Sequence, residues 1–327
     1  MSSETEPIKV QGQGQQGQGQ QQGQQQQNNP GQSAGSGQEN EAQQLGKSPY
    51  ASSAEGQNPG NNQDRQPGEA KDAPAEYTSN LQVKNLSKSF GSSQVMKNIN
   101  FDFASNAITT VLGPSGTGKS VLIKHLVGLL EPDSGEVLVD GEDIWSMTED
   151  ERYSMRTRFG VCWQDGALFG SMNIYDNTAF PLRTHTKMSE SEIEDKVMNL
   201  LEEVGLGHSA HKAPNEISGG MKKRAGFARA LVMDPEFVIF DEPDSGLDPV
   251  RTSLLCDIIL DVHSKLGGTY LLVTHDMATA KKVSDYIGLI WQGEVVHYGP
   301  AKEAFENEDP FVKQFLAGDS AGPLGMD

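Results

Sequence analysis

The amino-acid sequence predicts an α/β fold with a parallel-sheet core, an N-terminal antiparallel β flap and a helical insert around residues 165–215. Three observations support this fold class. Short β-branched runs cluster between residues 81 and 112 with little helix-like sequence between them, which favours an antiparallel flap. Later runs alternate with amphipathic stretches, as in parallel sheets. In the insert, apolar residues recur every three or four positions and indicate one buried helical face: Ile193, Val197, Leu200, Leu201 and Val204.

The individual elements follow from the same patterns. The expected strands are residues 81–86, 99–103, 108–112, 136–139, 159–163, 237–241, 270–274, 287–291 and 294–298. The expected helices are residues 119–129, 190–204, 219–233, 249–266 and 278–284. No run is long and apolar enough to span a bilayer, and no secretory signal opens the chain. We therefore expect a cytoplasmic protein that other chains hold at any membrane it serves.

Composition separates a tail from a folded domain. Residues 11–27 contain only Gln and Gly, and the sequence stays rich in Gln, Gly, Asn, Ser and Pro through about residue 78. Such a segment buries too little apolar surface to offset the entropy of ordering. We expect a disordered tail over residues 1–78, one domain over 79–318 and a short C-terminal tail over 319–327.

Charge and cysteine content exclude several classes of function. The formal net charge is −19, from 26 Lys and Arg against 45 Asp and Glu. An acidic chain of this kind is a poor non-specific binder of nucleic acid or of anionic membrane surfaces. Cys162 and Cys256 stand alone, so they form neither a disulfide framework nor a metal site.

Residues 113–120 form the pattern G-x-x-x-x-G-K-[ST] between an expected strand and an expected helix. Glycines let the backbone wrap a phosphate with its N–H groups, and the helix N-terminus adds positive potential. Lys119 would reach the β- and γ-phosphates, and Ser120 would ligate Mg²⁺. The alternative is a glycine-rich turn with a chance Lys-Ser. The expected nucleotide contacts are Gly113, Pro114, Ser115, Gly116, Thr117, Gly118, Lys119 and Ser120.

Five further motifs follow in order: Gln164 after a strand, the signature Ser218-Gly219-Gly220, Asp241-Glu242 at a strand end, the turn 245–248, and His275 after another strand. With the phosphate loop, this order resembles the ABC ATPase family over about residues 80–318. The resemblance implies an ABC cassette that works as a head-to-tail homodimer, with two ATP molecules between the phosphate loop of one copy and the signature of the other.

The resemblance also implies roles for these residues. Asp241, with Ser120 and Gln164, would hold Mg²⁺, and Gln164 would sense the γ-phosphate. Glu242 would be the general base that polarises the attacking water, and His275 would bind the γ-phosphate. Asp248 would organise the partner's site, whereas Ser218, Gly219 and Gly220 would meet the partner's ATP.

Phe90 has an alternative interpretation, and the signature has an unusual sequence. Phe90 lies where the family stacks an aromatic ring on adenine, although an aromatic residue beside a flap is often core. The signature departs from its usual form, with Ile217 for Leu and Met221 for Gln. Isoleucine keeps the apolar anchor, whereas Met removes a polar side chain and any hydrogen bond that it would make. Because Ser218, Gly219 and Gly220 remain, hydrolysis is still expected.

Several stretches resemble the ATPases of Mce-type (Mla/Mce, mammalian-cell-entry) lipid transporters: residues 164–169, 172–177, 181–183, 218–224 and 309–316. This resemblance implies two membrane permease subunits, lipid-binding Mce proteins in the same complex, and no direct contact with the lipid cargo. It places the chain at the cytoplasmic face of the membrane. We expect the surface around residues 166–169 to receive a permease helix; the alternative is that Leu168 and Phe169 are buried core.

Two other functions compete with lipid transport. The chain could energise another ABC importer or exporter for small solutes. It could also be a non-transport ABC protein acting on ribosomes or DNA, but those proteins usually carry two cassettes or a long coiled coil, and this sequence has one phosphate loop and no long heptad run.

Overall fold

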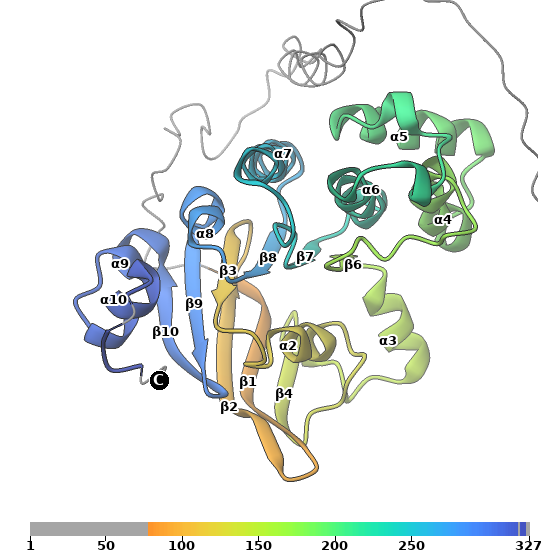
Figure 1. The fold of residues 1–327 in the computed structure, drawn as a ribbon. Coiled ribbons are helices and arrows are strands. Elements are labelled where there is room, and N and C mark those ends of the chain that lie inside the picture. Colours follow the sequence, from red (N-terminus) through yellow and green to blue (C-terminus); the bar gives the residue numbers. More distant parts are fainter. Residues whose placement is uncertain (1–77, 320, 325–327) are drawn as a thin grey trace, which may run out of the picture. The chain divides into compact units, whose positions relative to one another are not determined.

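The computed structural model describes residues 78–319 and 321–324. The tail predicted over residues 1–78 lies outside the described residues except for Thr78. Two sheets and the helices around them make up the described region (Figure 1). The first strand begins at Ser79 and the last helix ends at Ala317.

The first sheet is antiparallel and has the strand order β2-β1-β4-β5. Its members are β1 (Ser79–Phe90), β2 (Ser93–Ala104), β4 (Ser134–Val139) and β5 (Glu142–Asp143). Strands β1 and β2 form a hairpin that turns at Gly91, whose φ of 59° favours glycine. Both strands are longer than predicted, because backbone pairing continues through polar residues beyond the apolar runs.

The second sheet has the order β10-β9-β3-β8-β7-β6 and is parallel except for β10 at its edge. Its strands are β3 (Ile108–Leu112), β6 (Phe159–Cys162), β7 (Phe237–Asp241), β8 (Thr269–Thr274), β9 (Tyr286–Trp291) and β10 (Glu294–Pro300). All residues of β3, β7 and β8 are buried, as expected where both faces of a parallel sheet are covered.

The helices complete the fold. They are α2 (Lys119–Leu126), α3 (Glu149–Arg156), α4 (Ile174–His185), α5 (Glu190–Glu203), α6 (Gly219–Leu231), α7 (Pro249–Leu266), α8 (Met277–Val283), α9 (Ala301–Phe305) and α10 (Pro310–Ala317). Two short 3₁₀ turns, Gly207–Ser209 and Pro214–Glu216, close the helical insert. Within the described residues no helix combines the length and apolarity that crossing a membrane requires.

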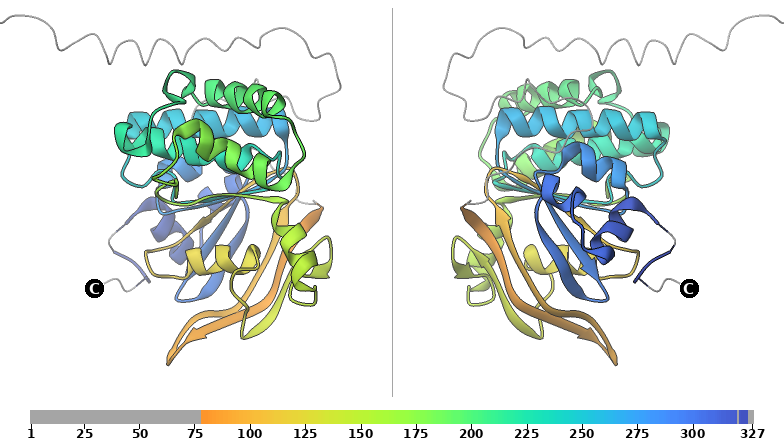
Figure 2. Two further views of the ribbon diagram at one scale, coloured as in Figure 1. Left: turned by 90° about the vertical axis from the view of Figure 1, so that its right-hand side faces the viewer. Right: turned by 90° about the vertical axis from the view of Figure 1, so that its left-hand side faces the viewer.

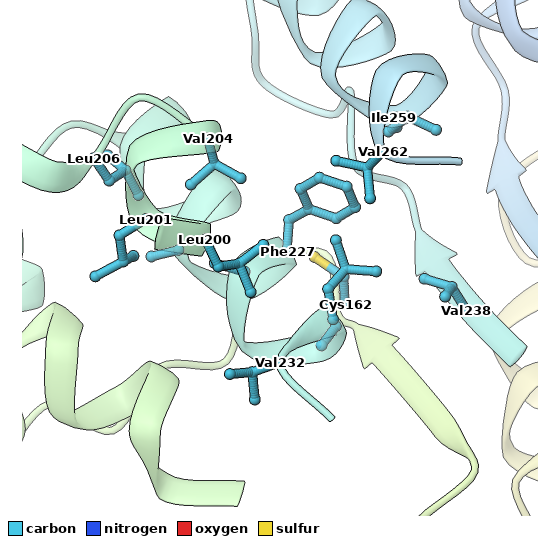
Figure 3. Close-up of a cluster of buried hydrophobic side chains, with 14 of the residues drawn as sticks. Cys162, Leu200, Leu201, Val204, Leu206, Phe227, Val232, Val238, Ile259 and Val262 are labelled. Atoms are coloured by element: carbon cyan, nitrogen blue, oxygen red, sulfur yellow. The ribbon is translucent and has the colours of Figure 1, made fainter. Parts of the chain in front are cut away.

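Alternate residues of β7 enter two different cores. Phe237 and Ile239 pack with α2 and the antiparallel sheet, whereas Val238 and Phe240 pack with α5, α6 and α7. In the second core, Phe227 of α6 lies beside Cys162 and Val262 (Figure 3). Figure 2 shows the layer of α4 to α7 on one side and the β1–β2 hairpin on the other. Helices α2 and α6 therefore cover opposite faces of the parallel sheet.

The predicted fold class is confirmed, with differences at the level of elements. The helix expected over residues 119–129 ends at Leu126, because the chain then turns through Gly128 at a φ of 64°. Helices α3, α9 and α10 were not predicted, and α4 was predicted only as part of the helical insert around residues 165–215. The C-terminal segment predicted to be a short tail packs in part on α10, where Leu324 N–H donates to Gln314 Oε1 at 2.9 Å.

Candidate nucleotide-binding site

The loop predicted to bind phosphate connects β3 to α2. Two positions in it require glycine. A Cβ at position 113 would lie 2.5 Å from the backbone oxygen of Ile290, and Gly118 has a φ of 93°. The buried Lys119 folds back over the loop, and its ammonium donates to the backbone oxygens of Gly113 at 2.7 Å and Pro114 at 2.8 Å. The glycines and Lys119 thus fix the backbone of the loop.

The N-terminus of α2 provides donors for an anion. Gly118 caps it without a side-chain hydrogen bond, and its first turn contains no acidic residue. The first N–H groups of a helix lack partners within it, so they are free to meet a phosphate. Burial lowers the pKa of Lys119, and the nearby carboxylates of Glu242 and Asp241 oppose this effect.

A candidate site for a divalent cation lies beside this helix. Ser120 Oγ is 3.2 Å from Oδ1 of Asp241, which ends β7. Burial raises the pKa of Asp241, so the carboxylate favours a compensating positive charge. The described residues contain no group of three or more His, Cys, Asp or Glu that could hold a metal without help. One hydroxyl and one carboxylate match Mg²⁺, which is commonly bound with substrate phosphates.

Glu242 and His275 face each other across the ends of two strands. His275 Nδ1 lies 3.6 Å from Glu242 Oε1, and the Glu242 side chain is only 18% exposed. Glu242 adopts a left-handed backbone conformation with a φ of 47°, which is uncommon for Glu. Its N–H donates to Val273 O at 2.8 Å, so β8 fixes the turn that presents its carboxylate.

Gln164 and Phe90 are two further residues of the predicted site. Gln164, after β6, donates to Ser245 Oγ at 3.2 Å and so lies against the turn that follows Glu242. Phe90 is 48% exposed at the hairpin end, so the alternative that it is core is wrong, whereas its stacking on adenine stays a prediction. Lys88 Nζ lies 5.9 Å from the centroid of its ring.

The signature residues and Asp248 lie at the N-termini of two other helices, α6 and α7. Ser218 caps α6 by accepting from Met221 N at 3.3 Å, and Gly219 and Gly220 open that helix. Asp248 caps α7 by accepting from the N–H groups of Val250 and Arg251, and the latter hydrogen bond lowers the pKa of Asp248. Helices α6 and α2 cover opposite faces of the sheet, so the signature and the predicted phosphate loop open different helices.

Helix α6 packs closely against the segment that follows Gln164. A Cβ on Gly226 would lie 2.6 Å from the Cα of Gly166, and Arg229 donates to the backbone oxygens of Gly166 and Ala167, each at 2.8 Å. The Arg229 guanidinium also lies 5.8 Å from the centroid of the Phe169 ring. The backbone after the predicted γ-phosphate sensor is therefore fixed to the signature helix.

Phe169 is exposed rather than core. It is 44% exposed and packs at 5.0 Å against Phe180, which is 37% exposed. The core alternative is therefore wrong for Phe169, whereas Leu168 is partly buried against the helical core. Two adjacent exposed aromatic rings are typical of a surface that binds another protein.

Sequence reasoning missed Lys223 and Asp244. Both are buried, at 7% and 6% exposure. Lys223 Nζ donates to the backbone oxygens of Glu242 and Ser245, and Asp244 accepts from the Thr274 hydroxyl. The available signal for Lys223 was a lysine two residues from both Met221 and Ala225 in a helix whose other buried residues are mostly apolar.

The G-x-x-x-x-G-K-[ST] loop follows the buried strand β3, and an Asp-Glu pair stands at the end of β7, which is separated from β3 by one strand. This arrangement is that of a P-loop nucleotide-hydrolysing domain. The ABC transporter family model matches residues 96–245. Over 246 residues, 75% of this chain and 71% of the relative, the sequence is 52% identical to "Probable ribonucleotide transport ATP-binding protein mkl" of Mycobacterium leprae (strain TN). The chain belongs to the ABC transporter family of ATP-binding proteins, and it hydrolyses ATP.

Other relatives agree with this assignment. The chain is 38% identical over 244 residues to "Intermembrane phospholipid transport system ATP-binding protein MlaF" of Escherichia coli (strain K12), covering 75% of this chain and 91% of the relative. This match confirms the predicted resemblance to the Mla/Mce group. The dimeric ABC transporter cassette MJ0796 aligns with a TM-score of 0.64 at 27% identity, over 68% of this chain and 98% of that chain. The Clostridium perfringens cbiO1 structure, part of the complex cbiONQ, aligns with a TM-score of 0.65 at 30% identity, over 73% and 95%.

Proposed function

We propose that this chain energises an Mce-type transporter that moves lipids across or between membranes, by hydrolysing ATP in sites shared between two copies. The observation that supports the chemistry best is the pair of Glu242 and His275, 3.6 Å apart at the strand ends beside the phosphate loop. Such a pair can polarise a water molecule and hold it in line with a phosphate.

In this proposal Glu242 accepts the proton of the attacking water, and the water oxygen bonds to the γ-phosphorus. The bond from that phosphorus to the bridging oxygen breaks, giving ADP and inorganic phosphate. Lys119 and the N–H groups of the phosphate loop stabilise the charge on the phosphates. His275 orients the γ-phosphate, and Phe90 stacks on the adenine. The contacts of the loop are Gly113, Pro114, Ser115, Gly116, Thr117, Gly118, Lys119 and Ser120.

Ser120 and Asp241, together with Gln164, would hold Mg²⁺. The ion supplies positive charge against the phosphate oxygens when it is bound. The hydroxyl–carboxylate contact of 3.2 Å and the buried position of Asp241 support this assignment.

A second copy completes each site in this proposal. The signature residues Ser218, Gly219 and Gly220 open α6 on the face of the sheet opposite α2, so they need another chain to meet ATP. A head-to-tail homodimer brings the signature of each copy to the phosphate loop of the other. Asp248, at the N-terminus of α7, would then organise the partner's phosphate site.

The partner at the membrane would be a pair of permease subunits. The exposed rings of Phe169 and Phe180 offer them an apolar contact, and Arg229 fixes the same segment to α6. A permease helix seated there would hold the chain peripherally at the cytoplasmic face. Lipid-binding Mce proteins would belong to the same complex, and the ATPase itself would not touch the cargo.

The names of two relatives suggest different cargoes. One names phospholipid transport and the other ribonucleotide transport. We favour lipid because the stretches after Gln164 and around the signature resemble Mce-type ATPases. Ribonucleotide, as a small solute, is the second candidate. The test is to purify the full chain with its membrane partners and reconstitute the complex in vesicles. ATP-dependent movement of labelled phospholipid supports the proposal, whereas movement of ribonucleotide alone overturns the lipid assignment.

A further inference from the structure

Lys223 is a buried lysine in the second turn of the signature helix. Its ammonium donates to the backbone oxygen of Glu242 at 3.2 Å and to that of Ser245. Both acceptors belong to the turn between β7 and α7, which presents the Glu242 carboxylate. The Lys223 side chain therefore connects α6, which Ser218 caps, to the turn that begins with Glu242.

The position is an unfavourable one for an ammonium group. Lys223 is 7% exposed on α6, whose buried residues also include Ala225, Phe227 and Ala228. Among the described residues it forms no direct ion pair with a carboxylate. Burial lowers the pKa of Lys223, and attraction to Asp244 opposes this effect. An apolar residue would suit the helix better, so the charge has a use beyond packing.

The same turn is fixed from the opposite side by β8. Asp244 accepts from the hydroxyl of Thr274, the residue immediately before His275. The Thr274 hydroxyl also accepts from Asp276 N at 3.0 Å. The turn is thus held between α6, through Lys223, and the end of β8, through Asp244.

Glu242 needs such support. Its φ of 47° lies in a region that Glu rarely adopts, and rare backbone conformations persist only where the surroundings hold them. Its N–H donates to Val273 O, and its carbonyl oxygen accepts from Ser245 N–H and from Lys223, each at 3.2 Å. The hydrogen bond from Lys223 is the one that depends on the position of α6.

We propose that Lys223 is a positioning residue that aligns Glu242 according to the position of the signature helix in the same chain. When the partner's ATP draws Ser218 and α6 into place, Lys223 sets the turn that carries Glu242. Engagement at one shared site would in this way prepare the base of the other. This inference rests on the proposed role of Glu242.

The test uses the purified full-length chain and three variants. Lys223→Met removes the ammonium but keeps the aliphatic stem, and Lys223→Arg keeps a donor cation. Lys282→Met is the matched control, because Lys282 also donates from a helix to a backbone oxygen, that of Ser253, and does not contact the Glu242 turn. For Lys223→Met we expect kcat to fall about 10- to 100-fold, as for a displaced catalytic group. Nucleotide affinity and thermal stability should stay near those of Lys282→Met, and Lys223→Arg should recover most of the turnover.

Other outcomes separate the inference from the proposed function. Unchanged kcat in folded Lys223→Met overturns the inference. A loss of kcat that is accompanied by parallel losses of stability and nucleotide affinity also overturns the inference. If Lys223→Met does not fold, Lys223→Arg decides, because a well-folded Arg variant with full turnover supports the inference and one without turnover overturns it. Glu242→Gln, measured alongside, tests the base: full turnover in that variant would overturn the proposed function itself.

Discussion

His275 Nδ1 lies 3.6 Å from Oε1 of Glu242, and the two residues come from the ends of different strands. The His275 side chain is 52% exposed and the Glu242 side chain 18%, so His275 lies at the surface and Glu242 largely beneath it, and the Glu242 carboxylate acts on Lys119 of the predicted phosphate loop. An acid and an imidazole in this relation can share the orientation of one water molecule between them.

Replacement of His275 by Ala should leave nucleotide binding intact and lower kcat roughly 100-fold or more, in the range for removing a group that positions a proton transfer. The phosphate loop keeps its own contacts, so the dissociation constant for ATP should change little. Steady-state turnover and binding of a fluorescent ATP analogue check this. His208→Ala serves as control, because His208 is exposed and lies outside the site. Full turnover by His275→Ala would remove His275 from the mechanism.

Complementation between two inactive variants tests the shared site. Lys119→Ala disables the phosphate loop and Ser218→Arg blocks the signature, so each homodimer should be inactive. Mixed dimers hold one site with both defects and one site with neither. Random pairing should restore up to about a quarter of the normal turnover, and less than that to the extent that engagement at the defective site is needed to align Glu242 at the intact one. No recovery after mixing and exchange of subunits would argue that each chain completes its own site.

The contact between Gly226 and Gly166 predicts the effect of one added methyl group. In Gly226→Ala the new Cβ would lie 2.6 Å from the Cα of Gly166 and would push the segment after Gln164 away from α6. We expect a loss of about 1–3 kcal/mol in unfolding free energy, typical of overpacking, and a lower kcat. Denaturant titration and turnover measure these quantities. Gly170→Ala is the control, since nothing lies within 4 Å of its added Cβ. Equal stability of the two variants would mean that the contact is easily relaxed.

How far the sequence predicts this molecule depends on how local the signal is. The phosphate loop, the acids after β7 and His275 were predictable because a short motif and its flanking strand lie together in the chain. Helix α3 was missed although Thr148 and Glu151 form a capping box, because the helix itself is mostly polar. The burial of Lys223 had a weak signal in the helix pattern, but its contacts were beyond prediction, because its acceptors lie 19 and 22 residues away and only the fold brings them together. The exposure of Phe169 likewise depends on how α4 packs beside it.

A charge on the exposed aromatic pair should break the attachment to the membrane. Phe169→Glu combined with Phe180→Glu places two carboxylates where apolar contact is expected, and desolvating them opposes binding. We expect loss of the permeases in co-purification, with ATP binding by the free chain retained. Val296→Glu, which alters another exposed apolar side chain on β10, should keep the permeases. Retention of the permeases by the double variant would place the interface elsewhere.

The most direct test of the account is ATP turnover and oligomeric state of Glu242→Gln in the presence of Mg²⁺. Gln keeps the size of the side chain and removes the carboxylate that accepts the proton, so hydrolysis should stop while the nucleotide still binds. We expect a stable dimer that retains two unhydrolysed ATP molecules, seen by size-exclusion chromatography and analysis of the bound nucleotide. Normal turnover, or a monomer that contains ADP, would contradict it.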